Sequence, residues 1–128
     1  MNVQFEGNVT GVSFTSTSDK RLKDNVEDVT TAEAGAILDT VSVKKYTRTD
    51  RNEKRVGFIA QDLAKVCTDH FAHIVGSISV AQEDAEGEDI PGSEQELLTV
   101  DYSRLVTVLW TTVQDLRSRV RQLEQRNV

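Results

Sequence analysis

A heptad pattern near the C-terminal end constrains the fold more than any other feature of this sequence. Between residues 102 and 126, apolar side chains recur in alternating steps of three and four. These residues, called the seam below, are Val106, Leu109, Val113, Leu116, Val120 and Leu123. The spacing predicts a helix over 101–126, capped by Asp101, with valine at the a positions and leucine at the d positions of a coiled coil.

Two interpretations of this helix are open. In a parallel coiled coil, Arg119 at a g position and Glu124 at the following e position can pair between chains. In a monomer, the seam would instead pack on the core. We favour the coiled coil, and valine at a with leucine at d by itself favours two strands. Leu105, Val108 and Trp110 form a second apolar face, which predicts that the first half of the helix also packs on a globular part.

Composition limits the possible classes of protein. A chain of 128 residues forms one domain, or one domain with a helical extension. Its 38% hydrophobic and 5% aromatic content is lean, so we expect part of the apolar surface to be covered by a partner chain. The net charge of −6 argues against a nucleic-acid interface. Seven acids and no base lie between Glu83 and Glu96, and the other 14 acids nearly balance the 15 bases.

Cysteine and histidine suggest neither a disulfide nor a metal centre. Cys67 is the only cysteine, which suits a reducing compartment, and we expect it to be a small core residue. His70 and His73 have the spacing of a metal-binding pair, but no third ligand is spaced to join them. No stretch is apolar enough over about 18 residues to indicate membrane insertion. We therefore expect no metal, no cofactor and no membrane partner.

Between the chain start and the final helix, the pattern predicts an α+β domain. A helix is expected over 32–40, begun by Thr30 or Thr31 with Glu33 in its first turn. Alternating residues predict a hairpin of strands over 43–48 and 54–59, in which Gly57 marks a close backbone approach or a bulge. A further helix is expected over 60–67, with Leu63, Ala64 and Cys67 inward, and a short strand over 97–100. Phe71, Ile74 and Val75 are expected in the core.

Three segments allow more than one interpretation. Residues 2–15 alternate like one or two short strands, either as an N-terminal hairpin or as the end of an upstream protein. Residues 24–30 are a connector with a possible strand around Val26 and Val29. Residues 77–96 form a polar, acidic insertion, either a solvated loop or a projecting arm.

A polar run near the start holds the one plausible nucleophile–base pair, Ser18 and Lys23. A serine hydroxyl needs a base to take its proton. A lysine can be that base only when it is neutral, which burial or the positive charges of Lys20 and Arg21 would favour. By spacing alone this pair is weak, since serine and lysine five residues apart are common, and a solvated turn is the alternative.

Three ordered blocks of sequence give a family resemblance. The Ser-Asp-x-Arg-x-Lys pattern of residues 18–23 resembles the signature of the autoproteolytic C-terminal intramolecular chaperone domains of phage tailspikes, tail fibres and neck appendages. Residues 55–62 (Arg-Val-Gly-Phe-Ile-Ala-Gln-Asp) are similar to the core motif of this Ser-Lys dyad peptidase family. Residues 98–106 are similar to the start of its long final helix. The resemblance runs from about residue 18 to 124.

The resemblance implies a homotrimeric chaperone that folds an upstream fibre, spike or appendage and then cuts itself off between Ser18 and Asp19. Ser18 would be the nucleophile and Lys23 the general base, while Arg21 would stabilise the oxyanion or brace the loop. Residues 1–18 would end the upstream β-structure and 19–128 would be the chaperone domain. The helix would form a parallel trimeric coiled coil, against the local preference for two strands.

The resemblance also implies partners and a place of action. The partners would be two further copies of the chain and the upstream segment of the same polypeptide. Assembly would take place in the host cytoplasm, with the parent protein in the virion tail or appendage. A regulatory, DNA-linked class shares the domain in animals, but the acidic surface and the lack of a basic region argue against that class here.

Two points stay open at this stage. Attack by the Ser18 hydroxyl on its own carbonyl would close a strained four-membered ring. Either the geometry is unusual, or the attacking serine comes from a neighbouring chain, or the hydroxyl activates water. The second point is whether Ser18 reacts at all, because a trimerisation module that stays attached to its fibre would share the coiled coil.

Overall fold

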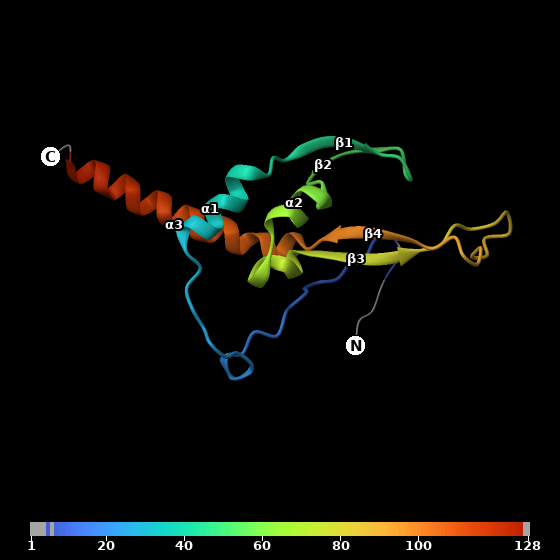
Figure 1. Ribbon diagram of the computed structural model, residues 1–128, viewed down its shortest axis with the longest axis horizontal. Coiled ribbons are helices and arrows are strands. Elements are labelled where there is room, and N and C mark those ends of the chain that lie inside the picture. Colours follow the sequence, from blue (N-terminus) through green and yellow to red (C-terminus); the bar gives the residue numbers. More distant parts are fainter. Residues whose placement is uncertain (1–4, 6, 127–128) are drawn as a thin grey trace.

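The long helix α3 (Tyr102–Arg126) organises the computed structural model, which describes residues 5 and 7–126 (Figure 1). Its N-terminal half lies against two short helices, and two β-hairpins extend from that end, away from its C-terminus. The other elements, in chain order, are η1 (Lys20–Leu22), α1 (Thr31–Thr40), β1 (Lys44–Arg48), β2 (Glu53–Gly57), α2 (Ala60–Val66), η2 (Asp69–Ile74), β3 (Val75–Val80) and β4 (Gln95–Val100). The α+β class with a long C-terminal helix is therefore confirmed.

The two hairpins form separate antiparallel sheets of two strands. In the first, β1 pairs with β2 so that Tyr46 lies opposite Arg55. In the second, β3 pairs with β4 so that Val75 lies opposite Val100. A two-stranded sheet is marginal on its own, so each hairpin depends on its contacts with the helices.

The core is small and lies almost wholly between helices. Within residues 5 and 7–126, seven hydrophobic side chains are buried. Six come from α1, α2, η2 and α3, and the seventh, Cys67, directly follows α2. The seven are Ala34, Ile37, Leu63, Cys67, Ile74, Leu105 and Val108. The expected inward positions of Leu63, Cys67 and Ile74 are confirmed, as is the packing of the first half of α3 on a globular part.

Side-chain caps fix where α1 and α3 begin. Thr30 forms a capping box with Glu33, since its hydroxyl accepts from the Glu33 N–H and the Glu33 carboxylate accepts from the Thr30 N–H. Asp101 Oδ1 accepts from the Ser103 N–H at 3.1 Å, as the sequence predicts. The Asp101 N–H also donates to the Ile74 carbonyl at 2.8 Å, which ties the start of α3 to η2.

The acidic insertion is shorter than the sequence suggests. Its first residues belong to β3 and its last to β4, so only 81–94 lies beyond the paired strands. Ser77 and Ser79 alternate with apolar residues on β3, and in the sequence these serines make the end of the strand look like part of the polar insertion. The remaining segment, called the arm below, is tied by hydrogen bonds from the Glu86 and Glu88 N–H groups to Asp84 Oδ1 at 3.0 and 2.9 Å.

Several further expectations are wrong. Residues 5 and 7–15 contain no strand, and residues 2–4 and 6 lie outside the described residues. The connector 24–30 also contains no strand. Ala64 is exposed and Val66 is half-buried in its place. Trp110 is 68% exposed, because two positions beyond the buried Val108 correspond to a rotation of about 200° around the helix.

Among the described residues, no helix combines the length and the apolar character needed to cross a lipid bilayer.

Candidate functional site

A single 3₁₀ turn brings Ser18 and Lys23 together. Asp19 caps the turn η1, and its carbonyl accepts from the Leu22 N–H at 3.0 Å. The Lys23 N–H then donates to the Lys20 carbonyl at 3.1 Å, which reverses the chain. As a result, Lys23 Nζ donates a hydrogen bond to Ser18 Oγ at 2.6 Å. The pair singled out from the sequence is therefore in direct contact within one chain.

Arg21 and Asp19 hold the turn in this shape. The Arg21 N–H donates to Asp19 Oδ1 at 2.9 Å, and its guanidinium reaches both carboxylate oxygens at 3.1 and 2.9 Å. The hydrogen bonds from the Arg21 side chain, then from its N–H, keep the pKa of Asp19 below its usual value. In this arrangement Arg21 braces the turn, which is one of the two roles considered for it.

The turn is exposed on all sides. Ser18, Asp19, Arg21 and Lys23 are all exposed, and Figure 1 shows the turn projecting below the helices at the end of two extended segments. A lysine can act as a general base only when its amine is neutral. Burial favours the neutral form of a lysine. The single chain thus supplies the contact between the two groups but not the desolvation.

Beside the turn, the connector and the α1–η2 surface enclose a cavity of about 530 Å³. Its lining includes Lys23, Glu33 of α1 and His70 of η2. The imidazole of His70 pairs with the Asp69 carboxylate at 3.2 Å, and both side chains are exposed. Sequence reasoning placed His70 in a possible metal pair and did not place it near the turn. The sequence separation of 47 residues leaves no local signal for this proximity.

The second and third sequence blocks meet at Gly57 and Tyr102. The Phe58 N–H donates to Tyr102 Oη at 3.0 Å, and the two aromatic rings lie 5.8 Å apart. A Cβ on Gly57 would overlap Tyr102 Oη and would lie 3.0 Å from Tyr46 Oη. The close approach predicted at Gly57 is confirmed, and its cause is the pair of tyrosine hydroxyls.

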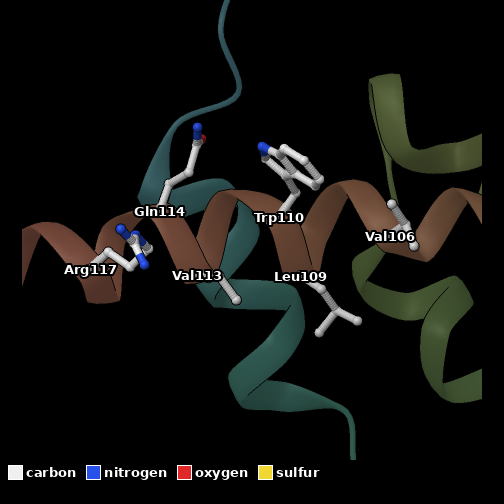
Figure 2. A pocket seen from close by; sticks show the side chains of 6 residues that line it. All are labelled: Val106, Leu109, Trp110, Val113, Gln114 and Arg117. Carbon is white, nitrogen blue, oxygen red and sulfur yellow. The ribbon is translucent and has the colours of Figure 1, made fainter.

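The seam is uncovered in the single chain. Its six side chains keep between 50% and 56% of their surface exposed, whereas Leu105 and Val108 on another side of α3 are buried. Figure 2 shows Val106, Leu109 and Val113 along one groove with Trp110 beside them. Gln114 and Arg117 complete its lining. Sequence reasoning assigned Trp110 to the wrong face, although its spacing of four from Val106 places it next to the seam.

The described part of the chain holds no group of three or more histidine, cysteine, aspartate or glutamate side chains suited to a metal ion. The backbone carbonyl of His73 accepts a hydrogen bond from Arg104 Nη1 at 3.0 Å, so the role of this residue that the structure shows is a contact with α3. Cys67 is buried, and this burial raises the pKa of its thiol, so it is a core residue rather than a reactive one.

Comparison with known proteins finds a family model that matches one part of the chain. A family model that bears the name of a peptidase family matches residues 18–72, from the serine of the turn to η2. The family is described as the chaperone of endosialidase. The resemblance to C-terminal chaperone domains is therefore confirmed over this segment, and it supports a chaperone role.

One solved structure is also similar. It is described as the crystal structure of a novel intramolecular chaperone, with 18% sequence identity and a TM-score of 0.49. The likeness covers 82% of this chain and 99% of the other. No curated protein matches the chain.

Proposed function

We propose that this chain is a homotrimeric intramolecular chaperone of a phage tail fibre, spike or appendage, which releases itself by cleavage between Ser18 and Asp19. The observation that carries the proposal is the 2.6 Å contact between Lys23 Nζ and Ser18 Oγ. It lies at the first residues of the segment that matches the chaperone-of-endosialidase family. A braced turn, an adjacent base and an adjacent peptide bond are the components that self-cleavage requires.

The chemistry follows from these groups. Hydrolysis breaks the bond between the Ser18 carbonyl carbon and the Asp19 nitrogen, adds water across it, and leaves a carboxylate on Ser18 and an amine on Asp19. Neutral Lys23 takes a proton from the attacking oxygen and returns one to the leaving nitrogen. Attack by Ser18 Oγ on its own carbonyl would close a four-membered ring. The attacking oxygen is therefore either a water activated by this hydroxyl or the serine of a neighbouring copy.

Exposure of the turn connects cleavage to assembly. Since the isolated chain leaves Lys23 in solvent, a neighbouring copy or the upstream segment must bury it before it can act as a base. Cleavage then follows assembly and does not precede it. An upstream β-structure with many non-local contacts has a high closure entropy, so a helical clamp that forms first speeds its folding. Loss of the clamp afterwards makes the assembled fibre kinetically stable.

The seam supports the oligomeric part of the proposal. Six half-exposed apolar side chains on one helix face favour helix association in water, at about 25 cal/mol for each Å² buried. Trp110 at an e position widens the apolar stripe beyond a strict a/d seam in the first half of α3. A wider stripe suits contact with two neighbouring helices, so it supports three strands over the two that valine at a and leucine at d favour.

The test is mass spectrometry of the chain expressed behind the segment that precedes it in its parent protein. We expect the wild type to break between Ser18 and Asp19 and both Ser18→Ala and Lys23→Ala to stay intact. Ser16→Ala and Lys65→Ala are matched controls, because Ser16 takes no part in the Ser18–Lys23 contact and Lys65 is an exposed lysine of α2, and both should still be cut.

An intact wild type that still assembles would overturn self-cleavage. It would leave the alternative function, a trimerisation module that stays attached to its fibre. Cleavage in all five proteins would instead point to an outside protease. The proposed setting is the host cytoplasm during virion assembly, with the chaperone domain released afterwards.

A further inference from the structure

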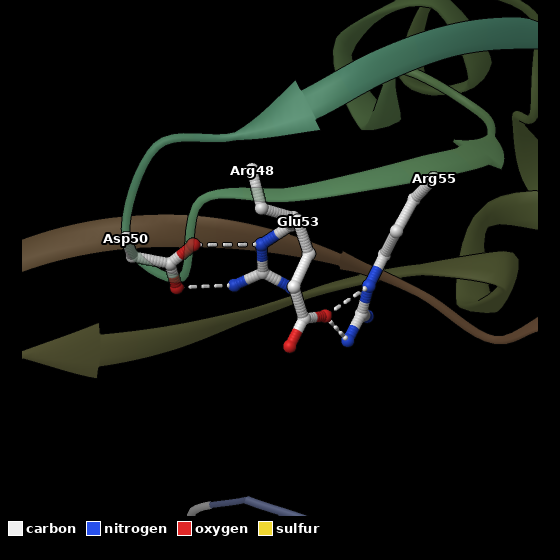
Figure 3. A network of polar contacts seen from close by, with 4 residues as sticks. All are labelled: Arg48, Asp50, Glu53 and Arg55. Atoms are coloured by element: carbon white, nitrogen blue, oxygen red, sulfur yellow. Dashed lines mark hydrogen bonds and ion pairs between the residues drawn. The ribbon is translucent and has the colours of Figure 1, made fainter.

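The β1–β2 hairpin has two faces of different character. One face turns toward the rest of the chain, since Gly57 meets Tyr102 and Arg48 shares a hollow with Ile78 of β3. On that face the guanidinium groups are already paired, Arg48 with Asp50 and Arg55 with Glu53 (Figure 3). Its positive charges are therefore partly neutralised within the hairpin.

The other face is exposed and carries positive charge without a partner. Side chains alternate along a strand, so Lys45, Thr47, Lys54 and Val56 share this outward face. All four are exposed, and Val56 keeps 67% of its surface in solvent. Within residues 5 and 7–126, neither lysine forms an ion pair. These residues line a shallow hollow of about 450 Å³.

The arm is the most acidic part of the chain. Its acids and those just beyond it are Glu83, Asp84, Glu86, Glu88, Asp89, Glu94 and Glu96. In the part of the chain that the structure describes, none of these forms an ion pair. The arm is nevertheless held in one shape, because a bridge joins Glu83 to Asp89 and the Gln82 N–H donates to Ser93 Oγ at 2.9 Å. Ile90 adds a partly exposed apolar side chain beside the acids.

Geometry separates the outward face from the arm of the same chain. The base of the arm adjoins the Arg48 face of the same chain's hairpin, since Glu83 and Asp89 line one hollow with Arg48. Lys45 and Lys54 look the opposite way. Both hairpins nevertheless extend in one direction from the start of α3 (Figure 1). In a parallel oligomer the hairpins and arms of all copies would project from the same end. An arm could then reach the outward face of the next copy.

We propose that the outward face of β1–β2 is an interface that receives the arm of a neighbouring copy. Lys45 and Lys54 face arm carboxylates such as Glu86 and Glu88, and Val56 faces Ile90. The inference rests on the parallel assembly of the proposed function. It adds a second, electrostatic contact at the end of the assembly that lies opposite the coiled coil. This contact fixes the orientation of each globular part relative to its neighbours around the axis of the coiled coil.

The test is cross-linking with a zero-length carbodiimide, which joins a lysine amine to a carboxylate in direct contact. Equal amounts of ¹⁵N-labelled and unlabelled full chain are unfolded, mixed, refolded and cross-linked. We expect peptides that join the Lys45 or Lys54 region to the arm, with mixed-isotope pairs as abundant as unmixed ones. Lys45→Glu/Lys54→Glu removes both amines and therefore only confirms the assignment of these peptides, whereas adding Glu86→Lys/Glu88→Lys in the same chain exchanges the charges and should bring the cross-linked pairs back.

Glu27→Lys/Asp28→Lys is the matched control for charge, and it should leave the cross-linked pairs unchanged. Light scattering on the same samples separates the two proposals. Assembled chains without these pairs, or with unmixed pairs only, would overturn the arm contact and leave the coiled coil standing. Chains that stay monomeric after refolding would overturn the proposed trimer and the arm contact with it.

Discussion

The Gly57–Tyr102 junction and the Ser18–Lys23 turn both hold residues that the sequence marks as motif blocks, but the single chain completes only one of them. At the junction, Phe58 and Tyr102 lie 44 positions apart and are joined by a hydrogen bond and a ring contact, and the adjacent Gly57 is buried. At the turn, every hydrogen bond joins residues no more than five positions apart, and every side chain is exposed.

This difference separates residues that stabilise the single chain from residues whose role depends on a partner surface. Junction residues stabilise the fold of each chain before any partner is present, so their loss lowers the stability of the monomer. Turn residues have geometry without burial, so their chemistry depends on what covers them. The seam belongs with the turn, because its side chains are exposed in the single chain.

The largest expected effect is on the seam. Leu116→Asp places a charge at a d position, where burial in an oligomer would leave it unpaired and costly. We expect the mass in solution to fall to that of one chain, measured by light scattering, while the helical signal of the globular part persists. Gln122→Asp introduces the same side chain at an exposed position of the same helix and should leave the assembly intact. An unchanged mass for Leu116→Asp would show that the seam is not the interface.

At the junction, Gly57→Ala should destabilise each chain. The new methyl group overlaps Tyr102 Oη, and overpacking of this kind costs about 1–3 kcal/mol. Gly35→Ala is the matched control, because nothing lies within 4 Å of its Cβ position and it sits inside α1, so it should stabilise by about 0.5–1 kcal/mol. Urea unfolding at equal protein concentration measures both. A Gly57→Ala chain that is no less stable than wild type would mean that the tyrosine hydroxyl moves aside at little cost.

Tyr102→Phe gives a smaller effect at the same place. It removes the acceptor of the Phe58 N–H but keeps the ring contact, which should cost about 1 kcal/mol. Tyr46→Phe removes a nearby hydroxyl that makes no hydrogen bond within residues 5 and 7–126, so it should cost less. Amide hydrogen exchange at Phe58 gives an independent readout and should quicken in Tyr102→Phe alone.

The smallest expected effect is the pH dependence of the Asp101 cap. Hydrogen bonds from the Ser103 side chain, and next from backbone N–H groups and Arg104, lower the pKa of Asp101 from its usual 3.8. The stability that this carboxylate contributes is full above pH 3.8 and is lost as pH falls through its lower folded pKa. The melting temperature of Asp101→Asn should therefore lie below that of wild type at neutral pH, and the gap should close in acid. A difference in melting temperature that does not change with pH would mean that the carboxylate charge does not cause it.

Local patterns predicted most of this architecture. The step of three and four in α3, the Thr30 and Asp101 caps, and the β1–β2 hairpin all depend on residues close in sequence. Trp110 was misplaced because its face depends on which side of α3 the core covers, which is a tertiary property. The pairing of β3 with β4 was missed for the same reason, since Ser77 and Ser79 carry little strand signal until β4 lies beside them.

The sequence singled out Ser18 and Lys23 as a pair, but it did not indicate what surrounds them. The spacing of Ser18 and Lys23 fits one 3₁₀ turn, and the structure contains that turn. The neighbouring cavity with Glu33 and His70 has no counterpart in the local sequence, because separate elements form it.

The anchoring of α3 by Leu105 and Val108 has a consequence for the rotational phase of the whole helix. Because these two side chains are buried and Asp101 is tied to η2, the angular position of the seam is set at the globular end. A helix turns by about 100° per residue, so one residue inserted after Val108 would rotate the downstream seam by that angle. An insertion of seven residues would almost restore the phase. Evolutionary change in the length of this helix should therefore proceed in heptads.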